Sequence, residues 1–185
     1  MRTWSGGRPR TGTIRRARLG VVAAPVVVAM VAIVLAGCGA THPAAAPAPA
    51  APAPVAGNPM ASQLIALHNG ARAGAGIGPL VESATLDGGA QATANRLVAT
   101  SGAGCNLVHT SVAQMDSWYG GTWGENIACA PDPAAGACAS MQTFEDLFIN
   151  SPPHRANILN GAYGHAGVGI ACGGAFTFVA VHFGP

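Results

Sequence analysis

The sequence contains no lysine, and its nine arginines are unevenly placed. Six of them fall within the first 18 residues, so the chain after Cys38 carries three arginines against seven acids, a net charge of −4. Binding to nucleic acid depends on clustered basic side chains that neutralise phosphates. Because this part of the chain has no such cluster, we expect no nucleic-acid partner.

The first 37 residues have the pattern of an export signal. Arginines precede the uncharged run "LGVVAAPVVVAMVAIVLAG", and Cys38 follows it. The motif "LAGC" at residues 35–38 resembles the lipobox of bacterial lipoprotein precursors, in which the cysteine becomes lipidated and N-terminal. We predict a signal peptide over residues 1–37, a lipid anchor to the membrane at Cys38 and an extracytoplasmic location for the rest. The alternative is an uncleaved membrane anchor, because the run is long enough to span a bilayer.

No two cysteines form a C-x-x-C pair, the spacing typical of zinc clusters, which makes a cysteine-rich zinc site the less favoured alternative. With Cys38 lipidated, four cysteines remain, and an even number outside the cytoplasm favours two disulfides. Spacing alone leaves three pairings open. We predict Cys129 with Cys138, which would close a short loop, and Cys105 with Cys172.

Residues 40–57 consist almost entirely of alanine and proline. This segment has too few large apolar groups to fold, and its prolines favour an extended spacer. We therefore predict a lipidated cysteine and linker over residues 38–57 and a single folded domain over residues 58–185, which is long enough to bury a core.

Periodicity predicts a domain that mixes helices and strands. Apolar residues recur at helical spacing after Asn58 and within residues 83–100, and a third helix begins near Ser140 and ends before Pro152. Strands are predicted at residues 122–129, 166–172 and 175–183, with Gly173 and Gly174 as a two-residue hairpin turn. Helices before and between antiparallel strands indicate an α+β fold built in layers.

The strand at residues 122–129 contains an acid on an apolar face. Side chains alternate along a strand, so Glu125 shares its face with Trp123, Ile127 and Cys129. An ionised carboxylate without partners is costly in such a place. We therefore expect other polar side chains to converge on Glu125.

Six motifs resemble the CAP superfamily, which includes cysteine-rich secretory proteins, antigen 5 and pathogenesis-related proteins. They are "LHNGAR" (67–72), "CNLVHTS" (105–111), "GENIA" (124–128), "SPPHRANIL" (151–159), "GVGIA" (167–171) and "VHF" (181–183). The resemblance implies a three-layer α-β-α sandwich with a small antiparallel sheet. It also implies a cleft that gathers two histidines and two acids. His109, Glu125 and His154 match three of these positions, and Glu145 is a better candidate for the fourth than Asp146.

Two imidazoles beside a carboxylate allow three roles. His109, His154 and Glu125 suit a divalent metal such as zinc, the histidines suit general acid–base chemistry, and the group could also be a buried polar network. No serine or cysteine nucleophile is evident beside them, so catalytic residues stay unassigned.

Other polar residues have structural interpretations. His68 and His182 lie on apolar faces and are interpreted as core histidines. Asn69, Arg72 and Asn157 are expected to bond to the backbone of neighbouring loops.

The resemblance implies no single activity, since proposals for the family include proteolysis, lipid binding and channel blockade. We interpret the chain as a membrane-anchored lipoprotein with one CAP domain, whose His/Glu-lined cleft binds a small apolar ligand or a peptide, with or without a divalent metal. The alternatives are a metal-dependent hydrolase at the cell envelope and a structural or host-interaction protein with a vestigial cleft. The oligomeric state is left open.

Overall fold

The structure is a computed structural model that describes residues 57–134 and 137–185. The predicted signal peptide (1–37), the lipidation site Cys38 and the linker as far as residue 56 lie outside the described residues. No helix in the described part of the chain is both long and apolar enough to cross a membrane.

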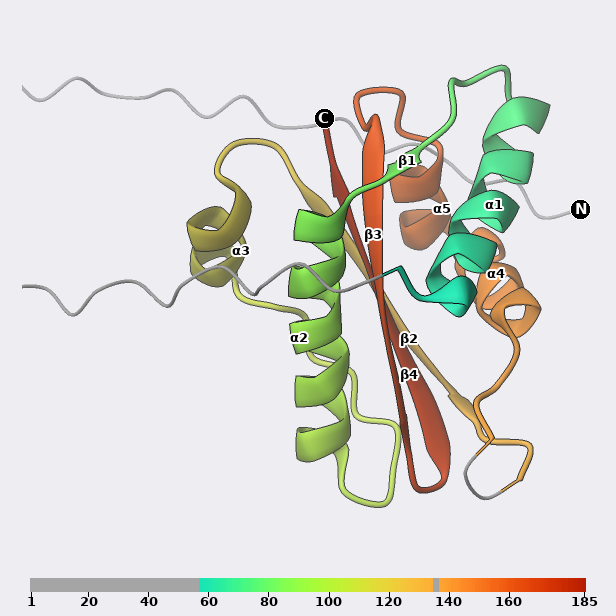
Figure 1. Ribbon diagram of the computed structural model, residues 1–185, viewed down its shortest axis with the longest axis vertical. Coiled ribbons are helices and arrows are strands. Elements are labelled where there is room, and N and C mark those ends of the chain that lie inside the picture. Colours follow the sequence, from blue (N-terminus) through green and yellow to red (C-terminus); the bar gives the residue numbers. More distant parts are fainter. Residues whose placement is uncertain (1–56, 135–136) are drawn as a thin grey trace, which may run out of the picture. The chain divides into compact units, whose positions relative to one another are not determined.

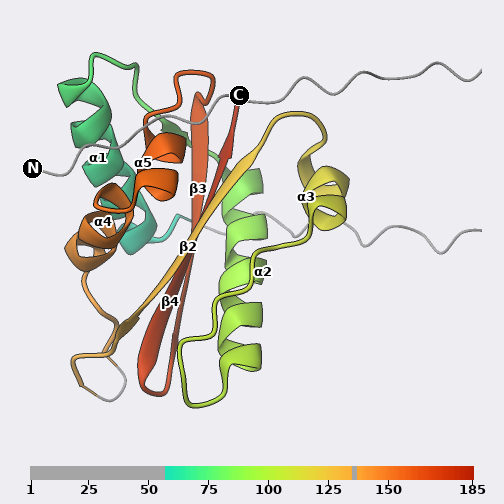
Figure 2. The ribbon, with the colours of Figure 1, turned by 180° about the vertical axis from the view of Figure 1, so that it is seen from behind.

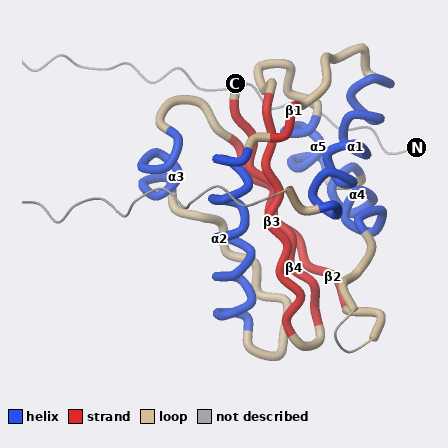
Figure 3. The backbone as a smooth tube through the Cα atoms, viewed as in Figure 1, coloured by secondary structure: helices blue, strands red, loops and turns tan. Residues whose placement is uncertain are grey.

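The described residues form a three-layer α-β-α sandwich, as predicted. Figures 1 and 2 show α2 on one side of the sheet and α1, α4 and α5 on the other. The four strands lie in the order β1-β3-β4-β2; β1 is parallel to β3, and the other pairs are antiparallel (Figure 3). The elements are α1 (Pro59–Gly74), β1 (Val81–Glu82), α2 (Ala84–Ser101), α3 (Val112–Tyr119), β2 (Gly124–Pro131), α4 (Met141–Ile149), α5 (Pro152–Ile158), β3 (His165–Gly173) and β4 (Phe176–Gly184).

Alternation along the strands gives each face of the sheet its own core. On one face, Ile127 and Phe178 pack with Leu97 of α2. On the other face, Val181 and Phe183 pack in a cluster that includes Phe148 of α4. A side chain therefore enters one core or the other according to its parity along the strand.

Helix α2 lies directly on β3, because β3 presents glycines to it. A Cβ atom added at Gly169 would lie 2.1 Å from the carbonyl carbon of Ala90, and one added at Gly167 would lie 2.1 Å from the amide nitrogen of Asp87. Gly167 and Gly169 are thus positions of close approach between helix and strand.

The helices predicted near Asn58, Ser83 and Ser140 are present, whereas α3 and α5 were not predicted. Asn58 caps α1, since its side chain accepts a hydrogen bond from the amide of Met60 at 3.0 Å. The proline pair after α4 begins a new helix, α5, because the first turn of a helix tolerates proline. A helix of seven residues, such as α5, is too short to show a clear apolar periodicity, which explains why the sequence did not predict it.

The predicted hairpin turn is wrong by one residue. Gly173 still pairs with Phe176, so the two-residue turn consists of Gly174 and Ala175. Gly174 has a φ angle of 84°, a conformation that favours glycine.

The predicted disulfide pairing is also wrong. The structure joins Cys105 to Cys129, with Cα atoms 6.1 Å apart, and Cys138 to Cys172, with Cα atoms 5.5 Å apart. Cys129 shares the face of Ile127, towards α2, and Cys105 follows α2 along the chain. Cys172 has the parity of Ile170, on the opposite face, and Cys138 precedes α4 on that side. Each bridge thus connects groups on the same face of the sheet.

Arg72 joins the C-terminal end of α1 to two loops. Its side chain is buried at 2% exposure, and its guanidinium donates to the carbonyl oxygens of Gly78, Ile158, Asn160 and Tyr163 at 2.6 to 3.1 Å. Asn69 bonds to both the carbonyl oxygen and the amide of Leu80, at 2.9 and 2.7 Å. The backbone-bonding roles predicted for these two residues are confirmed.

Peptide mapping of the unreduced mature chain should recover Cys105 linked to Cys129, and Cys138 linked to Cys172. Replacing Cys138 and Cys172 together by alanine should lower the free energy of unfolding by about 2–4 kcal/mol, because the bridge restrains the unfolded chain. Urea unfolding measures this loss, with the reduced wild type as a reference. Recovery of Cys129 linked to Cys138 would contradict the pairing described above.

Candidate ligand-binding site

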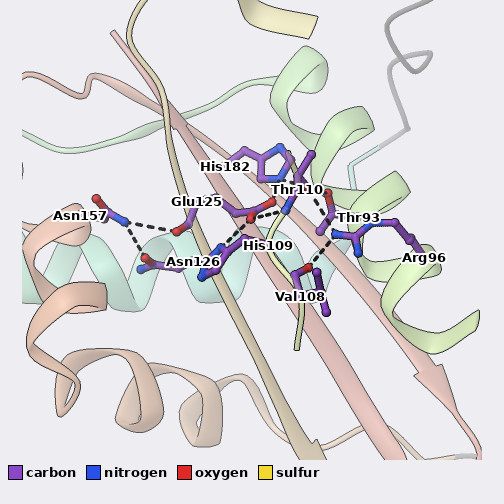
Figure 4. A network of polar contacts seen from close by, with 9 residues as sticks. All are labelled: Thr93, Arg96, Val108, His109, Thr110, Glu125, Asn126, Asn157 and His182. Carbon is purple, nitrogen blue, oxygen red and sulfur yellow. Dashed lines mark hydrogen bonds and ion pairs between the residues drawn. The ribbon is translucent and has the colours of Figure 1, made fainter. Parts of the chain in front are cut away.

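Glu125 is the centre of a polar cluster at the start of β2 (Figure 4). Its Oε1 atom accepts hydrogen bonds from Nδ1 of His109 at 2.7 Å and from the amide nitrogen of Thr110 at 2.9 Å. Its Oε2 atom accepts from Nε2 of His182 at 3.0 Å. The expectation that polar groups converge on this buried carboxylate is confirmed.

Three segments bring these donors together. Glu125 and His182 are directly paired across β2 and β4, so their side chains rise from the same face of the sheet. His109 and Thr110 lie in the loop between α2 and α3. The bridge from Cys105 to Cys129 ties the start of this loop to the later part of β2.

The hydrogen bonds keep Glu125 ionised. Burial alone would raise the pKa of Glu125, but hydrogen bonds from His182 and Thr110 outweigh it and lower this pKa to about 2. A carboxylate that accepts several hydrogen bonds is stabilised in its charged form. Glu125 is therefore a permanent buried anion at neutral pH.

His182 links Glu125 to a tyrosine that sequence reasoning missed. Its side chain is fully buried, and its Nδ1 atom lies 2.7 Å from the hydroxyl oxygen of Tyr119 at the end of α3. Burial, followed by the charges of Glu125 and Asp87, raises the pKa of Tyr119 above its ordinary value. The prediction of His182 as a core histidine is confirmed, but its bond to Glu125 was not foreseen. Strand pairing opposite Glu125 was the signal that could have revealed it.

Gly89 of α2 provides the space for this tyrosine. A Cβ atom at position 89 would lie 1.7 Å from the Tyr119 hydroxyl oxygen and 3.2 Å from Nδ1 of His182. Contacts this short do not occur between real atoms, so any larger residue would displace the tyrosine hydroxyl. The glycine that weakens the helical pattern of α2 is thus explained by packing.

His109 is the exposed member of the cluster. Its side chain is 60% exposed, and it lines a cavity of about 270 Å³ with Arg96, Thr110, Ser111 and Gln114. The residues that flank it along the chain include exposed apolar side chains, namely Leu107, Val108 and Val112. The cavity itself is thus lined by polar and charged residues, and exposed apolar residues lie near it along the chain.

His154 and Glu145 are placed differently from the prediction. His154 packs its ring 5.3 Å from that of Phe148, and burial, with a smaller effect of the His109 charge, lowers its pKa. It makes no hydrogen bond to Glu125 within the described residues. Glu145 pairs instead with Nδ1 of His68 in the layer formed by α1 and α4, so the structure does not join it to the cluster. His68 is fully buried, as expected for a core histidine.

Two asparagines connect α5 to the cluster (Figure 4). The side-chain amide of Asn157 donates to Oδ1 of Asn126 at 2.8 Å and to the backbone oxygen of Glu125 at 3.3 Å. Asn126 in turn donates to the backbone oxygen of His154 at 3.0 Å. Asn157 therefore bonds to backbone, as predicted, but in strand β2 rather than in a loop.

As placed, His109, His154 and Glu125 do not form a metal-ligand set. Within residues 57–134 and 137–185, no three His, Cys, Asp or Glu side chains converge in a way that could hold a metal ion. Among these three described residues, only His109 and Glu125 share a hydrogen bond, and the other oxygen of Glu125 accepts from His182. The zinc site therefore stays a prediction.

Replacing Glu125 by glutamine should lower the free energy of unfolding at pH 7 by about 1–3 kcal/mol, because an amide cannot accept all three hydrogen bonds. A carboxylate with a lowered pKa stabilises the fold above its ordinary pKa of 4.5 and loses that effect as pH falls to about 2. The wild type should therefore lose more stability than the variant over this pH range.

Urea unfolding at pH 7, 4.5 and 2.5 measures both effects. Asp146→Asn, which removes an exposed acid on α4, is the matched control. Equal stability and equal pH dependence of wild type and Glu125→Gln would show that the carboxylate is not held as described.

Comparison with known proteins agrees with this fold. The profile of the CAP family, the cysteine-rich secretory protein family, matches residues 65–183. A search of curated protein sequences finds no match.

Several solved structures resemble the chain. NaASP2, crystallised with Zn²⁺, has a TM-score of 0.54 and 14% identity over 69% of this chain and 80% of its own. An outer surface protein from Borrelia burgdorferi has a TM-score of 0.53 and 14% identity over 72% of this chain and 97% of its own. A cysteine-rich secretory protein from Staphylococcus aureus has a TM-score of 0.51 and 18% identity over 70% of this chain but only 40% of its own.

At these identities the structural likeness shows the fold alone. The family profile, however, extends from the first helix to the last strand and spans more than half of the sequence. It includes the loop that carries His109, the strand of Glu125 and the strand of His182. The chain therefore belongs to the CAP family of cysteine-rich secretory proteins.

Proposed function

We propose that the chain is an extracytoplasmic, membrane-anchored binding protein whose CAP domain takes a small apolar ligand or a peptide at the cavity beside His109. The observation that carries this proposal is an exposed imidazole that lines a cavity and is held in place by a buried carboxylate. The exposed apolar residues Leu107, Val108 and Val112 flank this imidazole along the chain. Ligand sites typically combine apolar surface with a few fixed polar groups.

Two features favour binding over hydrolysis. Ser111 lines the cavity, but its hydroxyl oxygen caps α3 by accepting from the amide of Gln114 at 3.2 Å, and it makes no hydrogen bond to His109 within the described residues. A serine nucleophile would need a base within hydrogen-bond reach. A metal-activated water, the other route to hydrolysis, would need a ligand set that these side chains do not form.

The two disulfides support the extracytoplasmic location, because such bonds persist in oxidising compartments. The lipobox-like sequence before Cys38 supports attachment of the domain to a membrane through lipid. In this arrangement the alanine- and proline-rich segment holds the binding domain away from the membrane surface.

Binding is tested by nuclear magnetic resonance on the isotopically labelled mature chain, with the tripeptide Ala-Ala-Leu and with laurate as separate probes. At least one probe should shift the amide signals of Arg96, Thr110 and Gln114. His109→Ala should weaken this response at least tenfold, whereas His165→Ala, which removes an exposed histidine of β3, should leave it unchanged. If neither probe shifts these signals at millimolar concentration, the binding function is wrong.

The anchor is tested separately. Cys38→Ala should abolish lipid attachment and leave an uncleaved precursor, because the cysteine side chain is the acceptor of the lipid. Labelling of expressing cells with a radioactive fatty acid should mark the wild type only. Equal labelling of both proteins would overturn the lipid anchor without affecting the binding site.

A further inference from the structure

Four side chains form a continuous hydrogen-bonded chain from the protein interior to the cavity. Tyr119 contacts His182, His182 contacts Glu125, and Glu125 contacts His109, at 2.7, 3.0 and 2.7 Å between the bonded atoms. Three of these four groups are buried or half-buried, and only His109 reaches solvent freely. The positions of the protons along this series determine whether Nε2 of His109 donates a hydrogen bond to a ligand or accepts one from it.

One assignment of protons satisfies these three contacts when both histidines are neutral. The ionised carboxylate of Glu125 can only accept, so Nε2 of His182 and Nδ1 of His109 must each carry a proton. The Nδ1 atom of His182 is then unprotonated and accepts from the hydroxyl of Tyr119, which retains its proton. His109 is left with a lone pair on Nε2, because the bond made by one ring nitrogen fixes the state of the other.

His109 therefore presents a hydrogen-bond acceptor to the cavity. Its Nε2 atom has no protein partner among the described residues. In water, a neutral histidine favours the opposite tautomer, with the proton on Nε2. Tyr119 and His182 are thus positioning residues, since they act on the ligand only through Glu125 and His109.

Arg96 supplies a positive charge to the same cavity. Its Nη2 atom donates to the backbone oxygen of Val108 at 2.9 Å and to the hydroxyl oxygen of Thr110 at 3.3 Å. Its Nε and Nη1 atoms make no hydrogen bond, and no acid pairs with it, within residues 57–134 and 137–185. Thr110 bonds both to Arg96 and, through its amide, to Glu125, so the guanidinium and the imidazole belong to one small site.

These groups require a ligand that has an anion close to an N–H donor. A guanidinium with free N–H groups matches a carboxylate, and an unprotonated imidazole nitrogen matches an N–H. The last residue of a peptide has both, because its amide nitrogen and carboxylate carbon are separated by one Cα atom. A fatty acid has the carboxylate without the N–H, and an internal peptide segment has the N–H without the charge.

Building on the binding function above, we propose that the cavity takes the C-terminal residue of a peptide. Its carboxylate pairs with Arg96, its amide N–H donates to Nε2 of His109, and its apolar side chain lies against Leu107, Val108 and Val112. The volume of about 270 Å³ lies just below the usual range for small-molecule sites, roughly 300–1,000 Å³, which suits one terminal residue.

The proton assignment is tested first, by ¹⁵N spectra of the histidine rings in the mature chain at a pH of about 8.5, above the ordinary pKa of histidine. His109 should carry its proton on Nδ1 in the wild type. Tyr119→Phe removes the hydroxyl that donates to His182 and should shift the Nδ1 signal of His182. Both histidines should keep their tautomers in this variant, because Glu125 still accepts from them. A wild-type His109 protonated on Nε2 would overturn the proposal.

The ligand is tested by calorimetric titration of the mature chain with four probes: acetyl-Ala-Leu as the free acid, its amide, the free acid with an N-methylated leucine, and laurate. Amidation and N-methylation should each weaken binding about tenfold or more, because each removes one hydrogen bond, the first of them charge-assisted. Arg96→Gln should abolish the preference for acid over amide. Arg155→Gln, which removes an exposed arginine of α5, should preserve it.

The outcomes separate the two proposals. Equal affinity for acid and amide, or binding of laurate as tight as that of the peptide acid, would overturn the C-terminal preference and leave a binding site at His109 intact. Absence of binding by all four probes would overturn the binding function as well.

Discussion

A carboxylate buried at the end of a strand sets the arrangement of the whole site. Glu125 cannot remain charged inside the domain unless several donors meet it, and these donors come from separate segments. The pairing of β2 with β4 supplies His182, and the loop after α2 supplies His109 and Thr110. The charge of Glu125 therefore couples three features: the position of that loop, the register of the sheet and the position of the end of α3.

Arg72 is also a charged side chain buried inside the domain, but it carries a positive charge. Its buried guanidinium is satisfied by four carbonyl oxygens rather than by an acid, and burial lowers its pKa. These carbonyls belong to loops on the side of α1 and α5, away from α2. The buried charges of Arg72 and Glu125 thus both help to fix irregular backbone, which hydrophobic packing alone does not hold in one conformation.

Much of this organisation can be predicted from the sequence, because strand alternation is a local property. The parity that places Glu125 with Ile127 also places Cys129 on the face of α2 and Cys172 on the opposite face. Applied to the cysteines, this rule places Cys129 and Cys172 on opposite faces. The helices next to Cys105 and Cys138 along the chain then indicate the correct partners, whereas loop length gives the wrong ones. Tyr119 could not be predicted in this way, since it lies at the end of a short helix whose packing depends on distant residues.

The space that Gly89 leaves for Tyr119 has an evolutionary consequence. Glycine inside a helix costs roughly 1 kcal/mol relative to alanine, so local stability favours replacing it. The tyrosine hydroxyl and His182 oppose that replacement, because a methyl group would occupy their place. A Cβ atom at position 89 would also lie 2.8 Å from Cζ of Tyr119, so alanine becomes acceptable there only where this ring has moved or a smaller side chain has replaced it. The two positions should therefore covary among homologues. A glycine at position 89 should then indicate that the hydrogen-bonded series from Tyr119 to His109 is present.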